Sequence, residues 1–239
     1  GKFARKLAEE KADDLGKYGT AGGVQGLSEK GILPTKNFQQ GEFSDAVEIS
    51  GETMADTILK ERDTCNACPV RCKRVVETEF NGEEVRPEYG GPEYETIAAL
   101  GSLCLNSDLD SIALANQKCN QYGLDTISTG DTIAFAMEAS EKGLLDWEVN
   151  WGDPEVVVEL VDAIAHKKGI GRELAKGISV LKEELGADFA VEIKGQEVPM
   201  HEPRGKKGLG ISYATTPRGA NHMEGAHDTM LEAKPLAPE

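Results

Sequence analysis

Residues 107–143 read SDLDSIALANQKCNQYGLDTISTGDTIAFAMEASEKG, and the fold class follows from this stretch. Apolar side chains recur at helical spacing in its first half, with Leu109 and Ile112 on one face, until Gly123 supplies a stop signal. The same period returns in the second half, where Asp131 supplies a start signal. The stretch therefore predicts two consecutive helices.

Further helices are predicted on both sides of this pair. Asp153 is a cap residue followed by Pro154 at the first helical position, which favours a helix start. Periodicity over residues 172–185 predicts another helix, and residues 52–62 predict one that leads into a group of cysteines. Helices thus account for most of the regular structure that we expect.

The expected β-structure is confined to short excursions. The pair Asn81-Gly82 is the strongest short-range hairpin signal, so a small β-hairpin is expected near residues 74–85. Minor strands are expected near residues 189–198, and a Gly- and Pro-rich loop after them. The predicted fold is therefore mainly α and multihelical.

The charge balance narrows the range of partners. The 239 residues include 42 acidic and 26 basic side chains, a formal net charge of -16. Such a surface repels phosphate backbones, so no nucleic-acid partner is expected. The negative charge serves either solubility alone or the attraction of a basic partner. No stretch approaches the roughly 20 apolar residues of a membrane span, so no membrane partner is expected either.

Three of the five cysteines lie close together, at Cys65, Cys68 and Cys72. Thiolates at this spacing on a tight turn suit an iron–sulfur cluster such as [4Fe–4S]. A structural zinc site and unliganded thiols are the alternatives that spacing leaves open. Cys104 and Cys119 are predicted to be packing residues. Clustered free thiols are typical of a reducing compartment, so we expect a cytoplasmic protein.

Four ordered motifs accompany the cysteines: GGPEYETIAALG over residues 90–101, YGLDTISTG over 122–130, EPRG over 202–205 and YATTPRGANH over 213–222. Together they resemble the C-terminal part of the aldehyde ferredoxin oxidoreductase family. The resemblance covers nearly the whole chain. It implies a helical domain over residues 1–200, which carries the cysteine loop and a pterin-binding turn, and the truncated start of a further helical domain over 201–239.

The resemblance also implies a chemistry. Family members hold tungsten, or molybdenum in relatives, on two pterins, oxidise aldehydes to carboxylic acids and pass electrons through a [4Fe–4S] cluster to ferredoxin. Cys65, Cys68 and Cys72 match three of the four cluster ligands, and the fourth is expected beyond residue 239. The isolated chain is therefore expected to be inactive and to retain neither cofactor.

The resemblance assigns the cofactor-binding residues as well. It matches Asp125 with a pterin-binding aspartate and places Ser128 and Gly130 in the turn beside it. A carboxylate can accept oriented N–H hydrogen bonds from a pterin edge. Judged from the residues alone, Asp125 and Ser128 equally suit the cap of a following helix.

Glu95 and His222 match the two side chains that the family places near the metal, and they are the predicted catalytic residues. A Glu or His in a partly dry pocket suits proton transfer. On its own, Glu95 is equally an acid in the first turn of a helix, and His222 a loop contact. His166 and His201 are given no role.

One feature of some family members is absent here. They carry Glu-x-x-His ligands for an iron that joins two subunits, and the corresponding positions hold Leu114 and Gln117. Any homodimer is therefore expected to lack a bridging iron. Outside the family, a zinc-stabilised helical interaction module is the main alternative, and an electron-transfer protein without catalysis is the weaker one.

Overall fold

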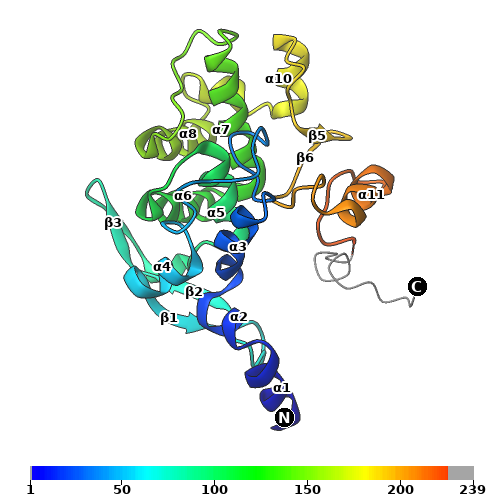
Figure 1. The fold of residues 1–239 in the computed structure, drawn as a ribbon. Helices are drawn as coiled ribbons and strands as arrows, with labels where there is room; N and C mark the ends of the chain where they lie inside the picture. Colours follow the sequence, from blue (N-terminus) through cyan, green and yellow to red (C-terminus); the bar gives the residue numbers. More distant parts are fainter. Residues whose placement is uncertain (1, 226–239) are drawn as a thin grey trace.

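The computed structural model describes residues 2–225 of the chain. Its centre is the pair of helices expected between residues 107 and 143 (Figure 1). Helix α6 spans Leu109–Tyr122; the Asp108 carboxylate accepts a hydrogen bond from the Ser111 backbone N–H at its start, and Gly123 in the left-handed region ends it. The mainly α, multihelical fold is confirmed.

Helix α7 spans Thr126–Glu141 and so begins five residues before the expected start at Asp131. Asp125 is its cap, with the carboxylate 2.8 Å from the Ser128 backbone nitrogen. Aspartate is a common capping residue, so Asp125 and Asp131 could each begin a helix. Only Asp125 has an extended backbone, and the backbone N–H groups that follow it have no acceptor within the helix. The predicted start at Asp131 was wrong.

The remaining helices surround this pair. Helix α5 (Tyr94–Leu100) packs closely against α7, and α8 (Pro154–His166) against α6. The helix expected over 172–185 is two helices, α9 (Gly171–Leu174) and α10 (Ile178–Leu185), because Gly177 between them adopts a φ of 82°.

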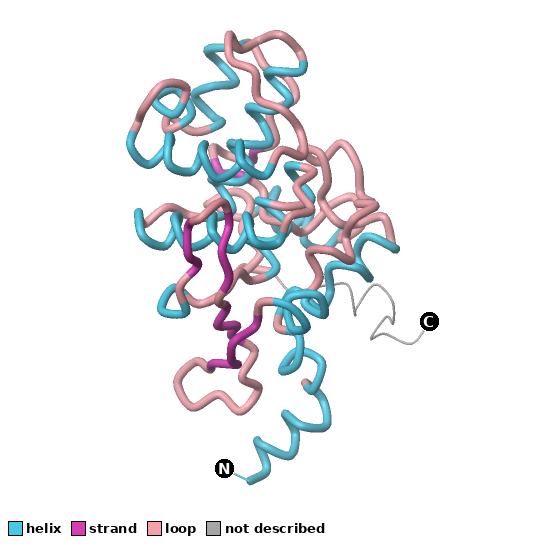
Figure 2. The backbone as a smooth tube through the Cα atoms, turned by 90° about the vertical axis from the view of Figure 1, so that its left-hand side faces the viewer, coloured by secondary structure: helices cyan, strands magenta, loops and turns pink. Residues whose placement is uncertain are grey.

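Among residues 2–225, three two-stranded antiparallel sheets lie around the helices. Their strands are β1 (Leu59–Asp63) with β2 (Lys73–Val76), β3 (Thr78–Phe80) with β4 (Glu83–Val85), and β5 (Glu192–Ile193) with β6 (Gln196–Glu197). The Asn81-Gly82 hairpin and the minor strands are confirmed. In Figure 2 the first two pairs extend from the helical body toward the N-terminal helices.

The helix expected over residues 52–62 is shorter than predicted. Helix α4 covers Gly51–Thr57 and the chain continues as β1, which pairs with β2 across the cysteine loop. The first arm of the predicted hairpin is therefore divided, because residues 75 and 76 belong to β2. Pairing between segments on either side of the loop outweighs the local helical pattern here.

The other elements lie at the two ends of the described chain or between helices. They are α1 (Lys2–Lys11), α2 (Asp13–Tyr18), α3 (Val24–Glu29), the 3-10 turns η1 (Thr20–Gly23), η2 (Pro87–Tyr89) and η3 (Ser102–Cys104), and α11 (Lys207–Thr215). Helix α11 stands where a loop was expected, and residues 226–239 of the predicted second domain lie outside the described residues. Within residues 2–225, no helix is both long and apolar enough to cross a membrane.

Candidate functional site

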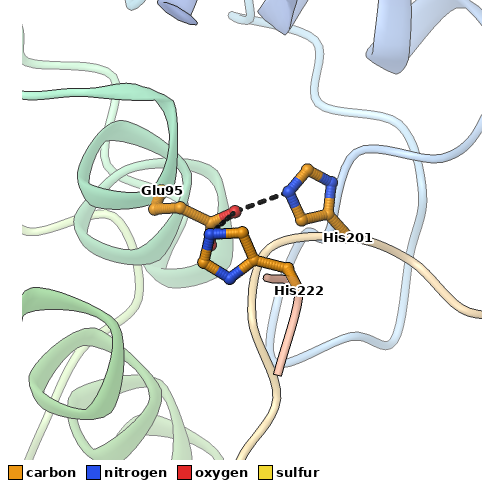
Figure 3. Close-up of side chains that lie close together, drawn as sticks. All are labelled: Glu95, His201 and His222. Atoms are coloured by element: carbon orange, nitrogen blue, oxygen red, sulfur yellow. Dashed lines mark ion pairs between the residues drawn. The ribbon is translucent and has the colours of Figure 1, made fainter. Parts of the chain in front are cut away.

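The carboxylate of Glu95 lies at the centre of the candidate site. Glu95 is in the first turn of α5, and its Oε2 accepts a hydrogen bond from the Met200 backbone N–H at 2.8 Å. Its Oε1 lies 2.7 Å from Nε2 of His201 and 3.9 Å from Nε2 of His222 (Figure 3). The structure thus brings the two predicted catalytic residues together and adds His201 to them.

These neighbours control the charge of Glu95. Burial raises the pKa of the carboxyl, but the close approach and charge of His201, the charge of His222 and the Met200 N–H together outweigh it. The net result is a pKa below the usual value for glutamate. Glu95 is therefore a carboxylate at neutral pH, and can accept a proton.

His201 was not predicted as a site residue. It lies four residues after the end of β6, and its ring contacts the rings of Tyr94 and His222 at centroid distances of 5.4 and 5.3 Å. Its Nδ1 lies 2.6 Å from Nζ of Lys206. The one available signal was its position immediately before the EPRG motif, since partners more than a hundred residues away cannot be read from spacing.

A cavity of about 620 Å³ contains this group of side chains. Its lining consists of Leu15, Thr20, Leu27, Glu93, Tyr94, Glu95, His201, His222 and Met223. Most of its wall is apolar, with the carboxylate and the imidazoles as the main polar groups. Such a cavity suits a small organic molecule that is held by apolar contact and oriented by few polar groups.

Glu95, His201 and His222 are also a possible set of metal ligands. One ligand atom from each lies within 4.8 Å of the others. A carboxylate with two imidazoles suits a divalent transition metal. In this structure Nε2 of His201 lies at ion-pair distance from Oε1 of Glu95, and that oxygen is buried without a hydrogen-bond partner among the described residues.

The three clustered cysteines lie together on the loop between β1 and β2. All are free thiols; Cys65 is exposed, and Cys68 and Cys72 are half-buried. The loop is held by hydrogen bonds from Cys68 N–H to Cys65 O at 3.1 Å and from Thr64 Oγ1 to Cys68 O at 2.6 Å. Burial, followed by the nearby charge of Glu93, raises the pKa of Cys72. A metal would have to displace a proton from this thiol.

Arg74 fixes this loop to the rest of the molecule. Its side chain is only 2% exposed, and it donates to the carbonyls of Gly16 at 2.9 Å, Lys17 at 2.6 Å and Cys72 at 3.0 Å. One guanidinium therefore joins the last turn of α2 to the end of the cysteine loop.

The predicted pterin-binding turn forms the first turns of α7. Asp125 is exposed and caps the helix, and Ser128 donates from its hydroxyl to Oε2 of Glu197 at 3.1 Å. Gly130 is buried, and a Cβ at this position would lie 2.6 Å from the backbone of Ala99 in α5. Gly130 thus serves close helix packing, while the pterin contacts of the turn stay predictions.

Residues 90–96 connect the cavity of Glu95 with the surroundings of the cysteine loop and of the α7 start. Glu93 lines the cavity of Glu95 and also a second hollow of about 380 Å³. Arg74 and Thr96 line that second hollow too, and Thr96 Oγ1 lies 2.8 Å from Thr126 Oγ1, beside Asp125. Neither Asp125 nor the clustered cysteines line either hollow. Cys72 is next in sequence to the lining residue Lys73, whereas Asp125 is connected only through its neighbour Thr126, which contacts Thr96.

The positions that correspond to bridging-iron ligands are buried in the helical body. Leu114 is 1% exposed. Gln117 accepts from the Arg86 backbone N–H at 2.7 Å and donates to the Glu84 carbonyl at 3.1 Å. Both side chains therefore support the packing of α6 and the segment after β4.

A helical domain with a thiol triplet on one loop and a partly buried Glu–His group in a nearby cavity is typical of the cofactor-bearing part of a redox enzyme. The family model described as "Aldehyde ferredoxin oxidoreductase, domains 2 & 3" matches residues 2–239. The chain belongs to the aldehyde ferredoxin oxidoreductase family.

Individual relatives agree with this assignment. Proteins named "Tungsten-containing aldehyde ferredoxin oxidoreductase" from Thermococcus kodakarensis and Pyrococcus furiosus are each 43% identical over 218 residues, 88% of this chain and 35% of the relative. The chain therefore spans about a third of the length of the curated relatives it matches. A solved structure titled "Active site complex BamBC of Benzoyl Coenzyme A reductase in complex with 1,5 Dienoyl-CoA" shares the fold, with a TM-score of 0.60 and 22% identity over 83% of this chain and 32% of that one.

Proposed function

We propose that this chain is part of a tungsten enzyme that oxidises aldehydes to carboxylic acids and passes the electrons through a [4Fe–4S] cluster to ferredoxin. The observation that carries the proposal is the half-buried Glu95 carboxylate beside His222, in a largely apolar cavity that adjoins the thiol loop through Glu93. The names of the relatives support the substrate class.

The residues present fit an iron–sulfur cluster. Cys65, Cys68 and Cys72 are free and share one loop, and Arg74 anchors that loop from within the protein. Cys104 and Cys119 are buried in the helical body, so a fourth ligand has to come from elsewhere in the enzyme. A bound cluster supplies one-electron transfer.

The turn at the start of α7 fits a pterin only in part. The exposed Asp125 carboxylate, with Ser128 nearby, would hold the polar edge of a pterin, whereas Gly130 is covered by α5. A bis-pterin tungsten or molybdenum centre supplies two-electron chemistry when bound. The isolated chain is proposed to be inactive and to retain neither this centre nor the cluster.

The side chains of the cavity would manage protons. Conversion of an aldehyde and a water molecule into a carboxylic acid releases two protons and two electrons; ferredoxin is the final acceptor of the electrons. The Glu95 carboxylate is available as the first proton acceptor because its pKa is held below the usual value. His222 would orient the aldehyde oxygen from the facing wall of the cavity.

The test is Glu95→Gln in the enzyme that contains this chain. The amide keeps the shape of the side chain but cannot accept the proton, so turnover is expected to fall by about a hundredfold or more. Aldehyde-dependent dye reduction measures turnover, and elemental analysis measures tungsten, which is expected to be retained.

Glu159→Gln is the matched control, because Glu159 is an exposed glutamate on the outer face of α8. It is expected to leave turnover unchanged. Normal turnover in Glu95→Gln, with tungsten present, would remove Glu95 from the catalytic residues and with it the main support for the proposal.

A further inference from the structure

Glu93 lies at the boundary between two hollows. Within residues 2–225 it is the one residue that lines both the cavity of about 620 Å³ beside Glu95 and the hollow of about 380 Å³ beside the cysteine loop. Its side chain is half-buried, at the residue that precedes α5. A charge in such a position acts on groups in both hollows, because partial burial weakens screening by water and salt.

A threonine holds the Glu93 carboxylate in place. The hydroxyl of Thr20 donates to Oε2 of Glu93 at 2.5 Å and accepts from the Tyr94 backbone N–H at 2.8 Å. The Glu93 side chain itself makes no capping hydrogen bond to α5. The start of this helix is therefore capped by Thr20, and the charge of Glu93 is not needed for it.

Two sets of contacts place Glu93 beside the Cys72 end of the cysteine loop. Gly19, one residue before the threonine, lies close to this end, since a Cβ there would be 3.1 Å from the Cys72 carbonyl oxygen. The segment before Glu93 reaches the same point. A Cβ at Gly91 would be 2.9 Å from Cβ of Arg74, whose Nε donates to the Cys72 carbonyl at 3.0 Å.

Glu93 differs from the other acidic residues of the hollow. Asp63 and Glu88 also line it, but both are exposed, so water and salt screen their charges. The basic residues that line it are Lys73 and Arg74. Among the described side chains, neither forms an ion pair with Glu93, so no direct partner cancels its charge.

We propose that the Glu93 carboxylate lowers the reduction potential of the iron–sulfur cluster held by Cys65, Cys68 and Cys72. The presence of that cluster rests on the proposed function. Reduction adds one electron, and thus one negative charge, to the cluster, and a nearby carboxylate makes this addition less favourable. In the proposed reaction the electron comes from aldehyde oxidation and leaves to ferredoxin. A lower potential favours the second transfer.

The test is Glu93→Gln in the enzyme that contains this chain, purified without oxygen. The amide removes the charge, but its oxygen can still accept from the Thr20 hydroxyl. At a fixed solution potential we expect the ratio of reduced to oxidised cluster to rise about tenfold, which for a one-electron couple is a positive shift of about 59 mV. Electron paramagnetic resonance of samples poised at known potentials measures the midpoint. An unchanged or lower midpoint would overturn the proposal.

Three further variants separate charge from structure. Glu93→Asp retains the charge and is expected to keep the midpoint near that of the wild type. Glu93→Ala is a second neutral variant with the same expected rise, and it decides the outcome if Glu93→Gln does not assemble a cluster. Glu79→Gln removes an exposed carboxylate from β3 and is expected to leave the midpoint unchanged. An equal shift in Glu79→Gln would contradict a specific role for Glu93.

The two proposals fail in different ways. Iron and acid-labile sulfide are measured in the same samples. A wild-type enzyme that contains neither would refute the proposed function and the role of Glu93 together. A fully assembled cluster whose midpoint does not respond to neutral substitutions of Glu93 would refute only the role of Glu93.

Discussion

Asp131 lies in the interior of α7 and is only 1% exposed. Within the described residues, neither of its carboxyl oxygens has a hydrogen-bond partner. Burial, followed by the charges of Glu197, Glu95 and Asp125, raises the pKa of Asp131 well above the usual value for aspartate. The side chain is therefore held in its neutral form by its surroundings.

Asp131→Asn is expected to stabilise the protein at neutral pH by about 1–3 kcal/mol, because it removes a group that loses its charge on folding. A raised folded pKa means that the folded state binds more protons than the unfolded chain above pH of about 4. Wild-type stability from this group thus falls as pH rises from there. The advantage of Asn should therefore shrink toward zero as pH drops to about 4.

Urea unfolding of both proteins across this pH range measures the difference. The exposed Asp146→Asn is the control and should show no such dependence. A constant difference between Asp131→Asn and wild type at every pH would contradict the assignment of a raised pKa to Asp131.

Contact between helices α5 and α7 depends on the absence of one side chain. A Cβ at Gly130 would approach the Ala99 backbone to 2.6 Å, so Gly130→Ala must push the helices apart. We expect a loss of about 1–3 kcal/mol, which exceeds the roughly 1 kcal/mol that alanine contributes in a helix. Thermal and urea unfolding measure the change.

Gly26→Ala in α3 is the matched control, because nothing lies within 4 Å of the added Cβ. It should leave stability unchanged or raise it by up to about 1 kcal/mol. If Gly130→Ala changed the free energy of unfolding no more than Gly26→Ala does, the inferred close contact between α5 and α7 would be contradicted.

Sequence motifs predicted those helices and strands whose ends are set by a capping or turn residue within the element itself. Helices α6 and α8 begin at capping aspartates, and the β3–β4 hairpin turns at Asn81-Gly82. Strand β1 was missed because its sequence, LKERD, lacks apolar alternation and is set by pairing with β2. Helix α11 was missed because Leu209 and Tyr213 form it by burial against distant residues.

Across the whole molecule, some residues of the family motifs lie at the segment 90–96 although they come from distant parts of the sequence: His222 lines one hollow there, and Thr126 contacts Thr96. The motifs predicted Glu95 and His222 correctly as neighbours. They did not reveal His201, because its contact with Glu95 exists only in the folded chain. The same holds for Arg74, whose partners on α2 precede it by more than fifty residues.

Metal analysis of the cysteine loop would distinguish the two main classes of function for the whole protein: iron with sulfide is expected for the enzyme and zinc for an interaction module. Cys68 lies on a loop that the buried Arg74 holds in place, so its thiol is available to a cluster without rearrangement of the fold. We expect the enzyme that contains this chain, purified without oxygen, to hold iron and acid-labile sulfide in similar amounts. Cys68→Ser should lose most of both.

Cys119→Ser is the control, because burial raises the pKa of Cys119 to about 12 and keeps it a protonated packing thiol in α6. It should retain iron and sulfide. Stoichiometric zinc without sulfide in the wild-type protein would instead favour a zinc-stabilised interaction module. In that case the cysteine loop would only stabilise the fold, and the acidic surface would be the part of the molecule that binds a partner protein.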